Sequence, residues 1–193
     1  MTPAARLPPW PEVPLEHGGI RLRPFRDDDV PMGLDLSTDP YVPLVSTLPA
    51  GVAEHGAREW LTRQRGRWAE GAGFSFAIAD ASTDRALGQL GLWLARAESG
   101  AGTVGYLVAP RERGRGTAVR ALRAVEDLAW SLPRLDRLEL YVEPQNTASI
   151  RTAGRAGYRR DAVVGHPRQP GGPDVEMQRW VRRRPDLQGP AAG

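Results

Sequence analysis

The sequence predicts a single α/β domain built on one mixed, mostly antiparallel sheet. In several short segments apolar residues recur at alternate positions, which is typical of strands that bury one face. In longer segments they recur every three or four positions, which is typical of helices packed on a sheet. A chain of 193 residues is long enough for one domain with a substantial core, and no repeat or long linker divides it.

The composition excludes several kinds of protein and of chemistry. Apolar residues make up 40% and charged residues 25% of the chain, as in soluble globular proteins. No apolar run reaches the roughly 18 residues of a membrane span, and the start lacks an apolar segment of the signal-peptide type. The chain has no Cys, which excludes disulfides, thiol nucleophiles and Cys-bound zinc, and which fits a cytoplasmic protein.

The charge of the chain also limits its partners. The net charge of +3 is too small to indicate nucleic-acid binding. All 26 basic residues are Arg, so the chain has no Lys for a Schiff base or a Walker-type phosphate site. An anion site must therefore use Arg side chains or backbone N–H groups.

The first half of the chain is predicted to contain an arm, three strands and two helices. Residues 1–15 are rich in Pro and are expected to form an extended arm. Residues 20–25 alternate as a strand, and the Asp residues at 27–29 then cap a short helix. The strands at 74–79 and 86–93 are joined by a turn. The helix at 52–70 is predicted from its one apolar face, which consists of Ala53, Ala57, Trp60, Leu61 and Trp68. Trp68 is expected to lie in the core.

The second half is predicted to contain two more helices and four more strands. With the two helices of the first half, this makes about four helices in all. The expected strands are at 103–108, 137–142, 158–164 and 175–181, the last two joined by a turn-rich hairpin loop. Residues 147–156 form a short helix. The domain is expected to span 16–183, with a flexible tail at 184–193. A helix at 116–131 has the clearest buried stripe, formed by Ala118, Ala121, Leu122, Val125, Leu128 and Ala129.

The loop between the 103–108 strand and the long helix is the clearest functional signal. Gly114 and Gly116 leave backbone N–H groups uncovered, and the helix N-terminus adds free N–H groups at the positive end of its dipole. Such a loop suits a diphosphate. It is not a Walker loop, because the Lys is absent, nor the dinucleotide fingerprint, because Val119 replaces its third Gly. An ordinary solvated turn with a run of Arg is the alternative at this point.

The same loop resembles the acyl-CoA motif Q/R-x-x-G-x-G/A of the GNAT N-acetyltransferases, in the residues Arg113-Gly-Arg-Gly-Thr-Ala118. A register that begins at Arg111 also matches. We prefer the first register, because it places Pro110 where the family has its proline and begins the helix correctly.

A second motif follows about 40 residues later. Asn146-Thr-Ala-Ser149, with Gly157-Tyr158 after it, is similar to the N-x-x-S and G-[FY] pair of the RimJ/RimL-type branch. This branch contains the ribosomal-protein N-terminal acetyltransferases and their relatives. The resemblance covers about residues 20–181, and the two motifs in this order make it specific.

The resemblance implies a GNAT fold, whose central strand pair splays apart, and an enzyme that takes acetyl-CoA as co-substrate and uses no metal. The pantetheine arm would pair with backbone groups of Tyr106, Leu107 and Val108. A backbone N–H near Leu107 or Val108 would polarise the thioester carbonyl. The amine would attack directly, so no Cys nucleophile is needed. The diphosphate would bind N–H groups of Arg113, Gly114, Arg115, Gly116, Thr117 and Ala118.

Two residues of the second motif have both a structural and a functional interpretation. Asn146 is a natural N-cap, and the matching Asn of the family contacts the CoA arm; the two roles are compatible. Ser149 is an ordinary helix residue or, as proposed for RimL-type enzymes, the group that protonates the CoA thiolate. Many family members carry a Tyr for that step where this chain has Ala153, so either Ser149 or solvent would act. Tyr158 is expected in the core.

The sequence does not identify the general base. His166 lies near the position where RimL-type enzymes have a Glu, and the pKa of an unperturbed His suits a base. Glu98, Glu143 and Asp174 are further candidates, but a chain of water molecules is the favoured base. Arg115, Arg120 and Arg151 are candidates for contacts to the phosphates of CoA, and otherwise surface residues.

The acceptor is expected to be a primary amine, either a protein N-terminus or a small molecule. Trp60 and Trp93 are candidate walls of its pocket, and the loops at 41–55 and 164–174 match the variable acceptor loops of the family. Acidic residues such as Asp35 and Asp39 are too scattered to indicate a polycationic acceptor. No nucleic-acid or membrane partner is expected, and the oligomeric state stays open, a homodimer included. Two alternatives are a CoA-binding module without turnover and a nucleotide-phosphate binder of another fold.

Overall fold

The computed structural model describes residues 7–185 and confirms the predicted fold class. One eight-stranded sheet has the order β1-β2-β3-β4-β5-β6-β8-β7, and all neighbours are antiparallel except the parallel pair β5 and β6. The strands are β1 (Leu15–His17), β2 (Ile20–Arg23), β3 (Gly73–Asp80), β4 (Ala86–Trp93), β5 (Ala101–Val108), β6 (Arg137–Val142), β7 (Arg159–Pro167) and β8 (Asp174–Arg183).

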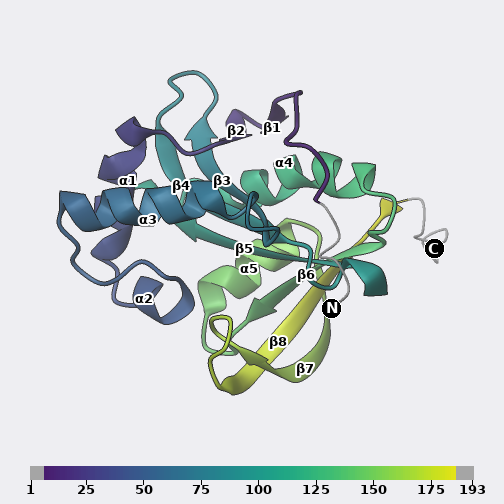
Figure 1. Ribbon diagram of the computed structural model, residues 1–193. Helices are drawn as coiled ribbons and strands as arrows, with labels where there is room; N and C mark the ends of the chain where they lie inside the picture. The colour runs from purple at the N-terminus through teal and green to yellow at the C-terminus, as the bar shows by residue number, and fades with distance from the viewer. Residues whose placement is uncertain (1–6, 186–193) are drawn as a thin grey trace.

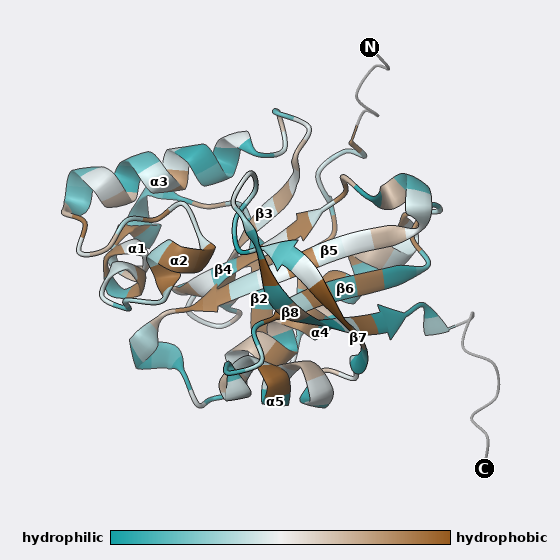
Figure 2. Ribbon diagram, turned by 90° about the horizontal axis from the view of Figure 1, so that it is seen from below, coloured by the Kyte–Doolittle hydropathy of each residue, from teal (hydrophilic) through white to brown (hydrophobic). Residues whose placement is uncertain are grey.

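Helices cover both faces of this sheet, as Figures 1 and 2 show. Three lie on one face and two lie on the other; after the expected substrates, the first is here called the acceptor face and the second the coenzyme face. The three helices are α1 (Val30–Ser37), α2 (Val42–Val45) and α3 (Glu54–Gly66), and the two are α4 (Thr117–Ser131) and α5 (Thr147–Arg155).

Two short elements were not predicted. Strand β1 has three residues and pairs with β2 across a two-Gly turn. Helix α2 has four residues, one of them Pro43. Four residues are too few to show a helical period. Helix α3 ends at Gly66, four residues before the predicted end, where a Gly weakens the helix and turns replace it. Strands β4 and β6 have the predicted bounds.

The core has two parts, one on each face of the sheet. On the coenzyme face, the predicted stripe of α4 is buried, and Ala121, Leu122 and Val125 have no exposed surface. On the acceptor face, α1 and α3 bury Leu36 and Leu61 above β3. Truncation of one such Leu to Ala would cost about 2–5 kcal/mol of stability. The two faces are thus held independently, which leaves the middle of the sheet free to carry a site.

The described part of the N-terminal arm packs onto the domain. The ring of Trp10 lies 5.5 Å from that of Phe74 and 5.0 Å from that of Phe76, between ring centroids. Trp68 donates its indole N–H to the carbonyl of Pro8 at 3.0 Å. Trp68 is 37% exposed, so its predicted place in the core is wrong: it lies in the turns that follow α3 and covers the arm instead. Residues 1–6 of the arm and 186–193 of the tail lie outside the described part.

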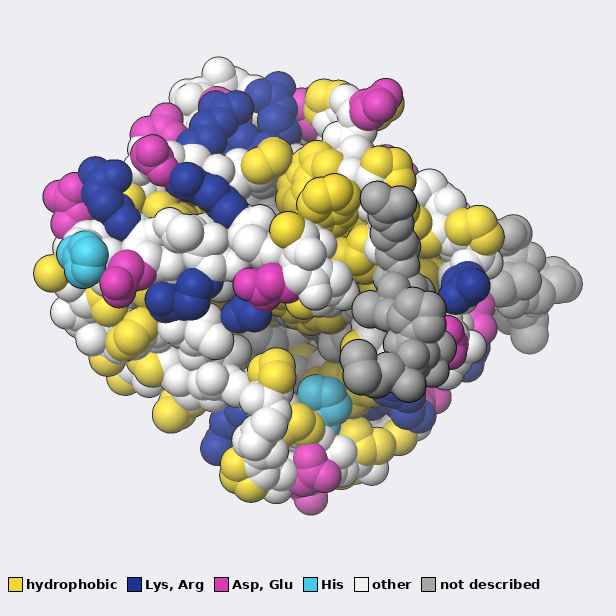
Figure 3. Space-filling model, in the orientation of Figure 1, with side chains coloured by type: hydrophobic (Ala, Val, Ile, Leu, Met, Phe, Trp, Pro, Cys, Tyr) yellow, Lys and Arg dark blue, Asp and Glu magenta, His cyan; other side chains and the backbone are white. Residues whose placement is uncertain are grey.

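The outer face of α3 is charged with both signs, as Figure 3 shows. Arg58 pairs with Glu54 one turn earlier at 2.6 Å, and Arg65 pairs with Asp27 before α1. Pairs of this kind favour a solvated helix face. No helix among residues 7–185 is long and apolar enough to cross a membrane.

Candidate active site

Strands β5 and β6 separate after a short paired stretch. They pair only where Ala101–Thr103 lies beside Arg137–Glu139, and beyond it the rest of β5 has no partner on that side. Because a parallel neighbour is lost there, backbone N–H and C=O groups of β5 face an open gap. This is the splayed strand pair that the fold class predicts.

The register with β4 decides which backbone groups of β5 face the gap. The N–H of Ala109 bonds the carbonyl of Leu87 at 2.9 Å. In an antiparallel pair the hydrogen-bonded positions alternate, so every second residue of β5, counted back from Ala109, bonds to β4 through its backbone. The backbone of Leu107 therefore points to β4, and the expectation that it pairs with a pantetheine arm is wrong. Tyr106 and Val108 point into the gap. The carbonyl of Val108 there accepts a bond from Arg113 Nε at 3.0 Å.

The loop between β5 and α4 forms a cradle of backbone N–H groups, here called the anion cradle (Gly114–Ala118). Gly114 and Gly116 have φ angles of 77° and 74°, a region that favours Gly, and so turn the N–H groups outward. Gly116 is the N-cap of α4 and offers no side-chain cap. Among the described residues no acceptor bonds the N–H groups of the cradle, and a Cβ on either Gly would meet only open space. The cradle can therefore receive an anion.

The Arg side chains around the cradle are held by carboxylates and carbonyls. Arg115 bonds Glu112 at 3.1 Å, and the pKa of that carboxyl is lowered, mainly by a hydrogen bond from Arg85. Arg120 bonds the carbonyls of Gly18 at 2.9 Å and Arg115 at 2.8 Å. These two Arg thus shape the loop, whereas Arg151 is exposed on α5.

Two acidic residues that looked scattered in the sequence lie against the cradle. Arg113 pairs with Asp39, and Arg111 pairs with Asp35 at 3.6 Å between Nε and Oδ1. Hydrogen bonds from the backbone of Tyr41 and from Arg113 hold the pKa of Asp39 below its usual value, although burial opposes them. The cradle is thereby connected to α1 and to the loop that follows it.

The second motif follows the end of β6, at the same open end of the gap as the anion cradle, which follows the end of the parallel strand β5. Asn146 is the N-cap of α5, and its Oδ1 accepts the N–H of Ser149 at 3.0 Å, which confirms the capping role. Ala153 is fully buried, and Tyr158 is 2% exposed, as expected of a core residue. Ser149 is half-buried in the first turn of α5, on the coenzyme face.

On the acceptor face, the middle of the sheet has two paired glycines, and the open space over Gly105 is here called the groove. Gly91 of β4 lies opposite Gly105 of β5. The indole of Trp93 covers Gly91, whereas a Cβ on Gly105 would meet nothing within 4 Å. Trp93 therefore forms a wall of the groove over Gly105. Trp60 does not reach it: this residue is 1% exposed and packs edge-on against Phe25, with ring centroids 5.7 Å apart, so its expected contact with an acceptor is wrong.

The two predicted acceptor loops meet at Glu143, at the end of β6. Arg168, from the loop between β7 and β8, bonds both carboxylate oxygens at 2.7 Å and 2.9 Å. Tyr41, from the loop before α2, donates its hydroxyl to Oε1 at 2.9 Å. The loops also bond directly, since Gln169 Nε2 donates to the carbonyl of Pro43 at 2.7 Å. Chiefly because of the Arg168 hydrogen bond, the pKa of Glu143 is lowered, and the group is ionised at neutral pH.

His166 stacks on Tyr141 of β6, with ring centroids 3.7 Å apart and planes 17° from parallel. Its Nδ1 lies 2.8 Å from the carbonyl of Pro167. The Tyr141 hydroxyl donates to Glu139 at 2.6 Å, and Glu139 is 1% exposed and also paired with Arg96 at 2.7 Å. The His166 ring is thus held in a stack on Tyr141, whose hydroxyl is bonded to the buried Glu139.

Glu139 was not singled out from the sequence. The signal was present, since Glu139, Tyr141 and Glu143 alternate with buried apolar residues along β6 and so share one face. The other two candidate bases, Glu98 and Asp174, are exposed.

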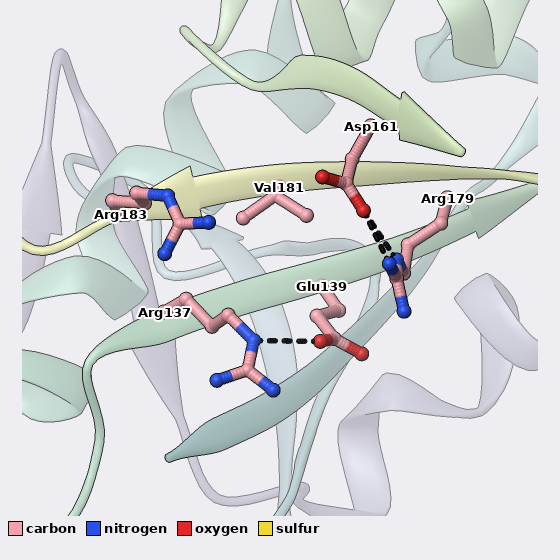
Figure 4. Close-up of a pocket in the computed structure, with 6 residues that line it drawn as sticks. All are labelled: Arg137, Glu139, Asp161, Arg179, Val181 and Arg183. Atoms are coloured by element: carbon pink, nitrogen blue, oxygen red, sulfur yellow. Dashed lines mark hydrogen bonds and ion pairs between the residues drawn. The ribbon is translucent and has the colours of Figure 1, made fainter. Parts of the chain in front are cut away.

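A polar cavity of about 230 Å³ lies on β6, β7 and β8, as Figure 4 shows. Arg137 pairs in it with Glu139 at 2.8 Å, and Arg179 pairs with Asp161. It contains none of the residues expected to bind coenzyme, and we do not assign it to the coenzyme. In the described part of the chain, no three His, Asp or Glu side chains are grouped so as to hold a metal ion.

The acetyltransferase (GNAT) domain family matches residues 20–159. The probable N-acetyltransferase YjcK of Bacillus subtilis is 29% identical over 110 residues, which are 56% of this chain and 61% of that protein, so the match spans less than two thirds of this relative.

Solved structures show the same fold at low identity. RimJ of Mycobacterium smegmatis, in complex with CoA-disulfide, has a TM-score of 0.70 at 21% identity, covering 92% of this chain and 88% of that one. A ribosomal-protein-S5-alanine acetyltransferase from Vibrio fischeri has a TM-score of 0.68 at 16% identity, covering 92% and 100%. The family match over most of the chain, together with the splayed strands and the anion cradle, shows that this protein belongs to the GNAT acetyltransferases.

Proposed function

We propose that the enzyme transfers an acetyl group from acetyl-CoA to a primary amine by direct attack in a ternary complex. The observation that carries this proposal is a gap between β5 and β6 with an anion cradle at one end and an empty groove over Gly105 on the acceptor face. The coenzyme and the acceptor would approach the same gap from opposite faces of the sheet. A covalent intermediate is then unnecessary.

The coenzyme would be held mainly by backbone groups. Its diphosphate would accept hydrogen bonds from the N–H groups of the anion cradle, and its pantetheine amides would pair with Tyr106 and Val108. The N–H of Val108 faces the gap and is the oxyanion donor that we favour for the thioester carbonyl. Arg113 would have to release the Val108 carbonyl for that pairing.

The reaction needs two proton transfers. The amine nitrogen attacks the carbonyl carbon, the carbon–sulfur bond breaks, and the thiolate takes a proton, for which Ser149 is the nearest candidate named by the motif. The nitrogen must lose a proton. Burial opposes the ionised form of Glu139, but hydrogen bonds, first from Tyr141 and then from Arg137, hold its pKa low; Arg168 does the same for Glu143, so both are weak bases. We therefore favour water as the proton carrier, and His166 is the further candidate base.

The acceptor class is open between a protein N-terminus and a small amine. RimJ/RimL-type neighbours favour an N-terminal α-amine. The test is thiol release from acetyl-CoA in the presence of short peptides with free N-termini and of small amines, with mass spectrometry of the products. The Ser149→Ala variant should lose turnover and keep its affinity for CoA.

A non-catalytic CoA-binding module is the competing outcome. CoA binding without thiol release over a broad amine panel would establish it. Thermal shifts by ATP or a dinucleotide, with none by CoA, would refute both readings and favour a nucleotide-phosphate binder.

A further inference from the structure

The phenol of Tyr106 is a buried polar group with no partner. Its hydroxyl oxygen is shielded from solvent, and no described residue hydrogen-bonds to it. A buried hydroxyl without a partner lowers the stability of a protein, and such groups often serve a function. Tyr106 is also one of the two residues whose backbone faces the gap. The unpaired phenol therefore belongs to the same residue that would hold the coenzyme.

The surroundings of the phenol place it beside Ser149. Tyr106 and Ile150 of α5 both pack against the core on the coenzyme face. Burial raises the pKa of Tyr106, while the nearby hydroxyls of Ser149 and Thr152 partly oppose that increase. The phenol is therefore protonated at neutral pH and lies next to the hydroxyl that the motif connects with the departing thiolate.

The chemistry of the leaving group favours a phenol behind the serine. A thiol has a pKa near 8.5 and a phenol near 10, whereas an aliphatic hydroxyl such as that of Ser149 is a far weaker acid. Ser149 alone is thus poorly matched to a thiolate as a proton donor. A phenol that returns a proton to the serine oxygen as the serine gives its own away reduces this mismatch, because a phenol is a stronger acid than an aliphatic hydroxyl.

We propose that Tyr106 is a positioning residue whose phenol, unpaired before the reaction, donates a hydrogen bond to Ser149 only in the transfer step and supplies, through it, the proton of the leaving thiol. As the carbon–sulfur bond breaks, the sulfur takes the Ser149 hydroxyl proton and the serine oxygen takes the Tyr106 proton. The tyrosinate regains a proton from water when CoA leaves. This proposal rests on the proposed acetyl transfer and adds a residue to it.

The chain contains a matched control. Tyr158 is also buried, with its hydroxyl unpaired among the described residues, but its charged neighbours are Glu126, Arg182 and Arg123. Tyr106→Phe and Tyr158→Phe thus each remove one unsatisfied buried hydroxyl and keep the ring. Both should melt at the same temperature as the wild type or higher, because no hydrogen bond is lost.

The test measures thiol release from acetyl-CoA by the full chain, with an amine and as slow hydrolysis without one. Tyr106→Phe should lower kcat tenfold or more, with the KM for acetyl-CoA changed less than twofold, and Tyr158→Phe should change neither. Tyr106→Phe combined with Ser149→Ala should be no slower than the Ser149→Ala variant, because both act on one proton path.

The outcomes separate the two proposals. An unchanged kcat in Tyr106→Phe, or effects that multiply in the double variant, would overturn the proton path and leave acetyl transfer intact. A wild type that releases no thiol under either condition would refute the transfer function, and the path with it.

Discussion

Arg168 holds the carboxylate of Glu143 through two hydrogen bonds, from Nε at 2.7 Å and from Nη2 at 2.9 Å. The two residues are 25 positions apart, and Tyr41, donating to the same carboxylate, is 102 positions away. A single buried acid thus joins the loop before α2 to the loop between β7 and β8. The bond from Gln169 to the carbonyl of Pro43 is a second link between the same two loops.

Loss of the Arg168 side chain should therefore loosen the acceptor side and spare the coenzyme side. In Arg168→Met we expect the acceptor KM to rise severalfold and the KM for acetyl-CoA to stay unchanged. The free energy of unfolding should change little, because the Arg168 side chain is 38% exposed and its pairing is screened by solvent. Steady-state kinetics with both substrates varied would check this. A change confined to the acetyl-CoA KM would contradict it.

The same contact predicts a pH dependence of stability. Arg168 lowers the pKa of Glu143 in the folded protein, so the ionised carboxyl adds stability above its unfolded pKa of about 4.3. That contribution is lost as the pH falls through the folded value. The wild type should therefore be more stable than Glu143→Gln at pH 7, and the difference should shrink below pH 4. Urea unfolding at several pH values measures it, and a difference that does not depend on pH would refute the assignment.

The anion cradle predicts a sharp loss of coenzyme binding in Gly116→Glu. The new carboxylate would face the diphosphate at a position whose φ of 74° also disfavours a side chain. We expect at least a tenfold weaker CoA affinity, by thermal shift or calorimetry. Gly116→Asn is the control, because Asn tolerates this conformation and carries no charge. Equal CoA affinity in the two variants would mean that the diphosphate binds elsewhere.

The groove over Gly105 predicts a variant that blocks the acceptor alone. A side chain fits there without a clash, since nothing lies within 4 Å of a Cβ on Gly105. Gly105→Leu should therefore fold, bind CoA normally and lose tenfold or more in kcat/KM for the amine. Gly154→Ala, in an equally open place on α5, should leave the kinetics unchanged. Full amine turnover by Gly105→Leu would remove the groove from the acceptor path.

Asn146 allows its two roles to be separated. Asn146→Ala should lose about 1 kcal/mol of stability, because the N-cap bond to Ser149 is removed. The same variant should also lose CoA affinity. Asn146→Ser restores a cap but not the amide group. We expect the Ser variant to regain the stability and not the affinity. If both return together, Asn146 contributes to coenzyme binding only through the cap.

The local patterns of the sequence predicted most of the fold because they report single elements. The bounds of β4 and β6 follow from apolar alternation, and the buried stripe of α4 follows from its helical period. These signals arise from neighbours within a few residues. They failed for α2, which is too short for a period, and for Trp68, whose apolar side chain lies beyond the end of α3.

Within the site, the sequence by itself determined the parts that depend on backbone conformation and local caps. The cradle needs two Gly residues in a left-handed conformation before α4, and the α5 cap needs Asn146 three residues before Ser149. Both requirements can be read from adjacent positions.

Only the tertiary structure decided which groups face the gap and which loops close the acceptor side. Strand register, set by pairing with β4, turned Leu107 away and Tyr106 toward the gap. Packing put Trp60 in the core and left Trp93 at the groove. The pairing of Glu143 with Arg168 and Tyr41 joins segments far apart in the chain. A sequence pattern carries no record of such contacts, because they form only when the strands and loops are brought together in space.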